Sequence, residues 1–134
     1  MTQYEHVLSN GISMPAMAAG TNWMKYRELT RILIAAFESG IRAIDTARDY
    51  GNESVVGRAI RTALRYTGLS REDIFITTKI GNAQQAGRRI DRELIVSLKN
   101  LRTDYVDLWL MHWPYPDYYC DTWHRMSECY KRGG

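Results

Sequence analysis

The chain has 134 residues and a mass of 15.5 kDa, enough for one domain of ordinary size. Apolar residues make up 45% and charged residues 25%, close to the average of globular proteins, which argues against a disordered, collagen-like or coiled-coil chain. The net charge of +3, from 18 basic and 15 acidic residues, is too even to indicate a nucleic acid or a membrane surface as partner.

The sequence also bears on cellular location. No apolar run approaches the roughly 20 residues of a membrane span, and the first residues lack the charged-then-apolar pattern of a signal peptide. Cys120 and Cys129, the two cysteines, are too few for a disulfide framework and do not form a Cys-x-x-Cys pair. We therefore expect reduced thiols and a cytoplasmic location.

Asn10-Gly11 is the first turn signal in the chain. It separates two short apolar segments, and this dipeptide is typical of a tight hairpin turn in which both residues adopt positive φ. The sequence therefore predicts an N-terminal β-hairpin. Residues 17–20 then form a small apolar run that predicts a strand. A helix ending before Gly40 is predicted next, from apolar residues at helical spacing: Leu29, Ile32, Leu33, Ala36 and Phe37.

The same strand-then-helix order repeats three more times. Strands are expected at 41–45, 74–79 and 105–111, and helices with apolar stripes over 56–64, 90–101 and 121–131. We interpret residues 1–134 as a single α/β domain, with a hairpin followed by about four βα units. Periodicity alone leaves two architectures open, a small doubly wound sheet and half of an eight-fold βα barrel.

Polar residues end three of the expected strands. Asp45, Lys79 and His112 each follow an apolar or β-branched run, and Tyr50 lies five residues beyond Asp45. Because parallel strands carry their functional groups at the carboxyl ends, the acid, the amine and the imidazole are expected at one mouth, with Tyr50 within reach of it if the loop after Asp45 turns back. Each alone has an ordinary explanation: a solvated strand end, a turn cap, a surface tyrosine or a core histidine.

Residues 45–53, Asp-Thr-Ala-Arg-Asp-Tyr-Gly-Asn-Glu, resemble the signature of the aldo-keto reductases, which runs Asp-Thr-Ala, two residues, Tyr, one residue, Asn-Glu. Further matches lie at 56–60, 75–79, 97–101, 104–108 and 112–114. The resemblance covers nearly the whole chain. It implies a TIM-type (β/α)8 barrel that reduces aldehydes or ketones to alcohols with NADPH, with NADH as the alternative cofactor.

The resemblance assigns catalytic roles to the four strand-end residues. Hydride addition builds negative charge on the carbonyl oxygen, so the site needs a proton donor there, and Tyr50 takes that role. A free tyrosine has a pKa near ~10, so a cation beside the phenol favours proton exchange at neutral pH; Lys79 would be that cation. Asp45 would be its counter-ion. His112 would donate a hydrogen bond to the substrate carbonyl.

The resemblance also implies the ligand contacts. Gly20, Thr21, Asn22 and Asp45 would approach the nicotinamide end of the cofactor. The small carbonyl substrate would contact Tyr50 and His112 and lie between Trp23 and Trp113, although apolar packing explains a tryptophan about as well. No metal site is expected: Cys120, Asp121 and His124 lie close on the last helix, but no second ligand pair of zinc spacing occurs.

The length falls well short of the roughly 250 residues of a complete barrel. We therefore expect a chain truncated before strand five, without the family's segments for the adenosine and phosphate end of the cofactor. A half barrel leaves two strand edges and an apolar face exposed, which favours self-association. Besides catalysis, two functions stay open: a binding or regulatory module related to the family, and a non-catalytic half barrel.

Overall fold

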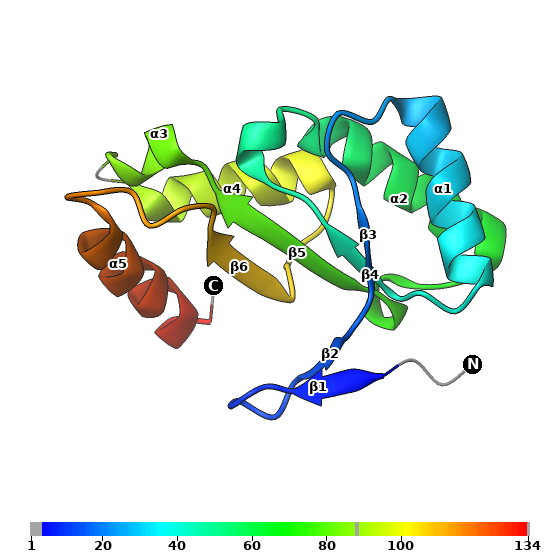
Figure 1. Cartoon of the computed structure of the whole chain (residues 1–134), viewed down its shortest axis with the longest axis horizontal. Coiled ribbons are helices and arrows are strands. Elements are labelled where there is room, and N and C mark those ends of the chain that lie inside the picture. Colours follow the sequence, from blue (N-terminus) through cyan, green and yellow to red (C-terminus); the bar gives the residue numbers. More distant parts are fainter. Residues whose placement is uncertain (1–3, 88, 134) are drawn as a thin grey trace.

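The computed structural model describes residues 4–87 and 89–133 (Figure 1). It begins with the predicted hairpin, in which β1 (Glu5–Val7) pairs antiparallel with β2 (Ser13–Pro15). Only Gly11 of the turn dipeptide has a positive φ, at 83°, so the prediction of positive φ at Asn10 was wrong. Gly11 N–H donates to the carbonyl of Leu8 at 2.9 Å, and Leu8 N–H to that of Ile12 at 2.8 Å. This bonding makes a three-residue loop with a glycine bulge, which needs a single positive φ.

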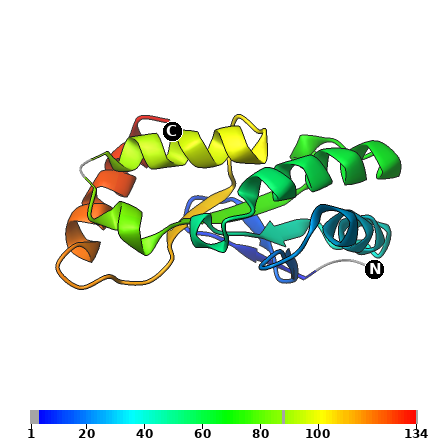
Figure 2. The same ribbon diagram turned by 90° about the horizontal axis from the view of Figure 1, so that it is seen from above.

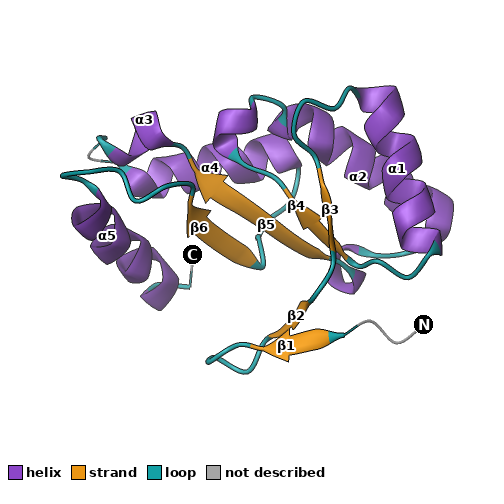
Figure 3. Ribbon diagram, in the orientation of Figure 1, coloured by secondary structure: helices purple, strands orange, loops and turns teal. Residues whose placement is uncertain are grey.

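Four parallel strands form the main sheet in the order in which they occur in the chain: β3 (Ala18–Gly20), β4 (Ala43–Asp45), β5 (Phe75–Ile80) and β6 (Leu108–Met111). Gly20 pairs in register with Asp45, and Asp45 with Thr77. Consecutive neighbouring strands joined by helices are the barrel arrangement, not the doubly wound one, so the half-barrel alternative is confirmed. Figure 3 shows the hairpin beyond the end at which these strands begin.

Helices follow each strand as the sequence predicts: α1 (Tyr26–Glu38), α2 (Glu53–Thr67), α4 (Ile90–Leu101) and α5 (Tyr119–Lys131). Three short pieces were not predicted: η1 (Arg48–Tyr50), η2 (Arg71–Asp73) and α3 (Asn82–Gln85). Figure 2 shows α2 and α4 along the same face of the sheet. No helix in the described part of the chain has the length and apolar content that a membrane crossing requires.

The main core lies between this sheet and its helices. It is built from the predicted stripes of α1 and α2 and from inward residues of β4 and β5, with Leu29, Leu33, Ile44, Val56 and Ile76 among its fully or almost fully buried members. The two helices α2 and α4 touch at Gly57, where a side-chain carbon would lie 2.5 Å from the carbonyl oxygen of Leu101. Glycine is therefore required for this close approach.

Two loops begin where strands were expected. Ile41 N–H donates to the carbonyl of Ala36 at 2.9 Å and the Arg42 guanidinium donates to that of Phe37 at 2.7 Å, so residues 41–42 are tied to the end of α1 and β4 starts at Ala43. Arg71 donates to the carbonyl of Tyr105 at 3.0 Å and to the carboxylate of Asp107 at 2.7 Å. Residues 105–107 are thereby held as a loop, and the strand prediction for them was wrong. Side-chain clamps of this kind leave no periodic signal.

A groove of about 650 Å3 opens beside β6. Its apolar lining comes from the hairpin, α4, β6 and α5, and includes Ile12, Leu98, Trp109, Met126 and Tyr130. Within the described residues, β3 and β6 each have one neighbour in the sheet, so each leaves one edge unpaired. Leu110 on β6 is 38% exposed, which is unusual for a parallel strand.

Candidate active site

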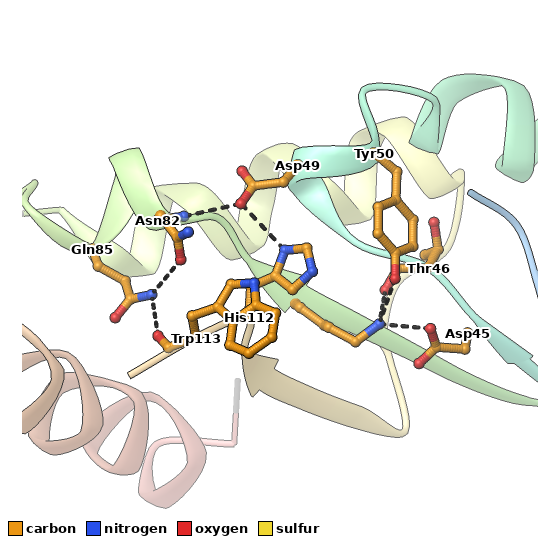
Figure 4. Close-up of polar contacts among 9 residues, drawn as sticks. Asp45, Thr46, Asp49, Tyr50, Asn82, Gln85, His112 and Trp113 are labelled. Carbon is orange, nitrogen blue, oxygen red and sulfur yellow. Dashed lines mark hydrogen bonds and ion pairs between the residues drawn. The ribbon is translucent and has the colours of Figure 1, made fainter. Parts of the chain in front are cut away.

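Three of the predicted residues lie at the carboxyl ends of neighbouring strands. Asp45 ends β4, Lys79 is the penultimate residue of β5, and His112 follows directly after β6. Backbone bonds set their positions: Thr46 N–H donates to the carbonyl of Thr77 at 2.9 Å, and His112 N–H donates to that of Ile80 at 3.1 Å. The parallel register thus brings an acid, an amine and an imidazole to one edge of the sheet (Figure 4).

The ammonium of Lys79 is bonded to three oxygens. Its Nζ donates to Asp45 Oδ1 at 2.6 Å, to the backbone carbonyl of Thr46 at 3.0 Å and to the phenol oxygen of Tyr50 at 3.3 Å. The Lys79 side chain is 14% exposed and that of Asp45 is 36% exposed. An ammonium group that is mostly shielded from water needs a counter-ion, which Asp45 provides.

Tyr50 reaches Lys79 because the chain folds back after β4. The single turn η1 ends at Tyr50, and Gly51 follows it with φ 67°, a conformation suited to glycine. The Lys79 Nζ lies 5.1 Å from the centre of the Tyr50 ring. The tyrosine that sequence reasoning placed within reach of the site is therefore in contact with it.

His112 completes the cluster. Its ring meets that of Tyr50 edge-on, with centroids 5.5 Å apart, and stacks on that of Trp113 at 6.3 Å. The His112 Nδ1 lies 3.2 Å from the Asp49 carboxylate, a partner that sequence reasoning did not assign. All four predicted catalytic residues are thus brought together.

Glu53, whose carboxylate is buried behind the site, was also missed as an individual residue. It is 2% exposed and accepts hydrogen bonds from Thr78 Oγ1 at 2.8 Å, Ser97 Oγ at 3.1 Å and Asn100 Nδ2 at 3.3 Å. The guanidinium of Arg48 lies 3.7 Å from it. Glu53 thereby ties α2 to β5, to α4 and to the loop that carries Tyr50. The motif at residues 45–53 ends in Asn-Glu and so includes Glu53, but it does not indicate the structural role of this residue.

The expected cofactor and substrate positions lie at the same edge of the sheet. Asn52 Nδ2 donates to the carbonyl of Thr21 at 2.7 Å, and Thr21 Oγ1 donates to that of Asp45 at 3.0 Å. These bonds hold the end of β3 beside the end of β4, while Asn22 is exposed. Trp23 is 89% exposed and Trp113 is 64% exposed. Neither tryptophan is used in the core.

The cysteine-containing helix α5 offers no comparable cluster. Cys120 is exposed, Cys129 is buried, and His124 lies 3.4 Å from Glu128 one turn along the helix. Across residues 4–87 and 89–133, no three metal-ligating side chains gather.

A tyrosine, a lysine, an aspartate and a histidine thus lie together at the carboxyl ends of the strands of a half barrel. A model of the aldo/keto reductase family matches residues 12–134, and the chain belongs to this family. It is 39% identical over 132 residues to the uncharacterized oxidoreductase YtbE of Bacillus subtilis, covering 98% of this chain and 47% of that protein.

Two further relatives extend the comparison. Methylglyoxal reductase DkgA of Escherichia coli is 41% identical over 128 residues, covering 94% of this chain and 44% of that protein. The crystal structure of a Bombyx mori aldo-keto reductase in complex with NADP has a TM-score of 0.87 and 32% identity, covering 99% of this chain and 48% of that one. The chain therefore spans about half the length of the relatives it matches.

Proposed function

We propose that this chain carries the catalytic half of an NAD(P)H-dependent carbonyl reductase, with Tyr50 as the proton donor to the carbonyl oxygen. The observation that supports the proposal is the contact of 3.3 Å from the Lys79 ammonium to the Tyr50 phenol oxygen. Tyr50 donates its proton as charge develops on the substrate oxygen. The neighbouring ammonium stabilises the phenolate that this transfer leaves behind, and Asp45 keeps that ammonium in place.

Residues at the ends of β3 and β4 fit the nicotinamide end of the cofactor. A side-chain carbon at Gly20 would meet no atom within 4 Å, so the space beside this strand end is open. Asp45, in register with Gly20 and 36% exposed on its side chain, offers a carboxylate to hydroxyl donors. Gly20, Asn22 and Asp45 would contact this end of NADPH or NADH, which supplies the hydride when bound. Thr21 is fully buried and its hydroxyl is bonded to the carbonyl of Asp45, so its part would be to hold these strand ends in place.

A small carbonyl compound is the proposed substrate. Trp113 stacks on His112 beside the cluster, and Trp23 presents an exposed ring in the loop after β3; such rings favour contact with a small organic molecule. His112 orients the carbonyl group. The relative DkgA is named a methylglyoxal reductase, so methylglyoxal is the first substrate to test.

The proton-donor role is tested by Tyr50→Phe. Because the present chain covers 44% of DkgA, turnover is best measured in a chimera in which this chain is followed by the part of DkgA beyond the matched residues. We expect Tyr50→Phe to lower NADPH-dependent methylglyoxal reduction by about 100-fold or more, with NADPH binding retained. Tyr66→Phe is the control, since Tyr66 is 69% exposed on α2, remote from the cluster.

Two outcomes would contradict the proposal. Turnover by the Tyr50→Phe chimera equal to that of the unmodified chimera would remove Tyr50 from the role of donor. An unmodified chimera that binds NADPH and reduces no aldehyde or ketone would contradict the assignment of carbonyl reduction itself.

A second copy of the chain is the partner we propose for the unpaired strand edges. In a twofold arrangement about the barrel axis, β6 of each copy pairs with β3 of the other, so that both edges of each sheet are covered. Alone, one copy is expected to bind NADPH weakly, because by family resemblance the phosphate and adenosine subsites belong to the other half of a barrel.

A further inference from the structure

Asp49 lies on the side of His112 that faces away from Tyr50. Its Oδ2 is 3.2 Å from His112 Nδ1 and also accepts a hydrogen bond from the backbone N–H of Asn82 at 3.1 Å. The side chains of Asp49 and His112 are 34% and 17% exposed. In Figure 4 the imidazole ring lies between Asp49 on one side and Tyr50 on the other.

Both partners are held in place by backbone. Asp49 lies within η1, and its carboxylate packs so closely on Gly81 that a side-chain carbon there would overlap it. His112 is fixed by the hydrogen bond from its own N–H to the carbonyl of Ile80 at 3.1 Å. The carboxylate and the imidazole therefore come from two separate loops, and the Asp49 carboxylate is held by the backbone N–H of Asn82 as well as by His112.

An ionised carboxylate only accepts hydrogen bonds, so a bond between Asp49 and His112 requires the proton to be on Nδ1. We propose that Asp49 is a positioning residue that fixes the neutral imidazole of His112 as the Nδ1–H tautomer, leaving Nε2 without a proton. The two ring nitrogens point in nearly opposite directions, so Nε2 faces away from Asp49. The consequence for catalysis rests on the proposed function, in which His112 orients a carbonyl.

This tautomer changes what His112 does during reduction. Neutral His112 has only a lone pair on Nε2, which repels a carbonyl oxygen but accepts a hydrogen bond from an alcohol. The imidazolium carries protons on both nitrogens, so it donates to the carbonyl through Nε2 while Nδ1–H stays bonded to Asp49. The tautomer therefore favours carbonyl reduction with protonated His112 and alcohol binding with neutral His112.

Other charged and titratable groups face the same ring. Tyr50 reaches it from η1, and the Lys79 ammonium of β5 lies on the phenol oxygen of that Tyr50. The Asp45 carboxylate of β4 neutralises that ammonium at 2.6 Å. Asp49 is the group among these that bonds directly to the imidazole, so its removal is the test of the tautomer.

The tautomer is measured on the 134-residue chain by NMR correlation of ring 15N and 1H atoms, which distinguishes Nδ1–H from Nε2–H. We expect neutral His112 to show Nδ1–H, and Asp49→Leu, which removes the acceptor at similar size, to change it to Nε2–H. Asp49→Asn is the matched variant: its amide oxygen still accepts, so Nδ1–H is retained. His6 and His124, the other two histidines, serve as internal references. Neutral His112 with Nε2–H in the unmodified chain would overturn the proposal.

A second readout is the pH profile of methylglyoxal reduction in the chimera. Above the pH at which His112 loses its proton, kcat/KM of the unmodified chimera is expected to fall as pH rises, approaching about tenfold per pH unit. With Asp49→Leu, neutral His112 donates through Nε2–H, so the fall should shrink to less than about twofold per pH unit. Equal slopes in the two proteins would contradict the proposal. If no variant reduces a carbonyl while NMR still shows Nδ1–H, the proposed function fails and the tautomer stands.

Discussion

At the scale of the residue, the structure around the site depends most clearly on the buried carboxylate of Glu53. Three side chains donate to it, and at 2% exposure no solvent replaces them. A buried donor that loses its acceptor costs about 1–3 kcal/mol, and removal of one member of a buried charged group costs about 3–5 kcal/mol.

We therefore expect Glu53→Gln to lower the free energy of unfolding by about 1–3 kcal/mol and Glu53→Ala by about 3–5 kcal/mol. Urea denaturation of the chain, followed by circular dichroism, measures both. Glu38→Gln is the control, since Glu38 is exposed near the end of α1. Equal stability of the Glu38 and Glu53 variants would show that the hydrogen-bond network contributes nothing to the fold.

Individual residues of the site were predictable to different degrees. Asp45, Lys79 and His112 each end an apolar run, so a parallel sheet brings them together once its register is assumed. Tyr50 could be placed within reach only on the condition that the loop turns back, because its place depends on a turn with Gly51 at φ 67°, and its role came from the family motif. The contacts of Asp49 and Glu53 join segments far apart in the sequence and follow no local spacing. Such pairs become visible only after folding.

At the scale of the element, the helices were predictable because their apolar stripes reflect the buried face, and the strand limits were less so. The loop at 105–107 is set by Arg71, whose guanidinium also lies 3.9 Å from the centre of the Tyr105 ring. The start of β5 is preceded by a capping box in which Ser70 donates to Asp73 through backbone N–H and hydroxyl. These bonds lower the pKa of the Asp73 carboxyl. None of these contacts produces a periodic pattern of apolar residues in the sequence, so none could be predicted from it.

The crossing of α2 and α4 gives a prediction at this scale. On an isolated helix, Gly57→Ala would stabilise by about 1 kcal/mol through helix propensity. Here the added methyl group would overlap the Leu101 carbonyl, so the helices must separate and the core beside Val56 loosens. We expect a lower thermal unfolding midpoint for Gly57→Ala and a slightly higher one for Ser54→Ala, an exposed position on the same helix. A rise for both variants would show that the crossing has room for a methyl group.

At the scale of the whole molecule, the half barrel leaves its inner face without a cover among the described residues. Trp109 and Met111 of β6 pack toward the cluster of Ile80, Ile90 and Met126, so the alternate residue Leu110, 38% exposed, lies on the opposite face of the strand. An exposed apolar face beside an unpaired strand edge is a strong site for association.

Self-association of two copies is therefore expected at micromolar concentration, with a mass near twice 15.5 kDa by light scattering after size-exclusion chromatography. Leu110→Lys places a charge on the face that the second copy would bury, and we expect it to shift the equilibrium to monomer by about tenfold or more in dissociation constant. Ile95→Lys is the matched control, because Ile95 is 62% exposed on α4. A stable, well-folded monomer at all concentrations would contradict the two-copy barrel. A dimer that is weakened by Leu110→Lys and not by Ile95→Lys would locate its interface on the inner face.

NADPH titration of that dimer, followed by tryptophan fluorescence, then tests whether the paired halves bind the cofactor. We expect weak quenching, because a second copy of the same half adds no subsite for the phosphate and adenosine end of the cofactor; saturable quenching by the dimer, absent from the Leu110→Lys monomer, would show instead that two such halves form a cofactor site.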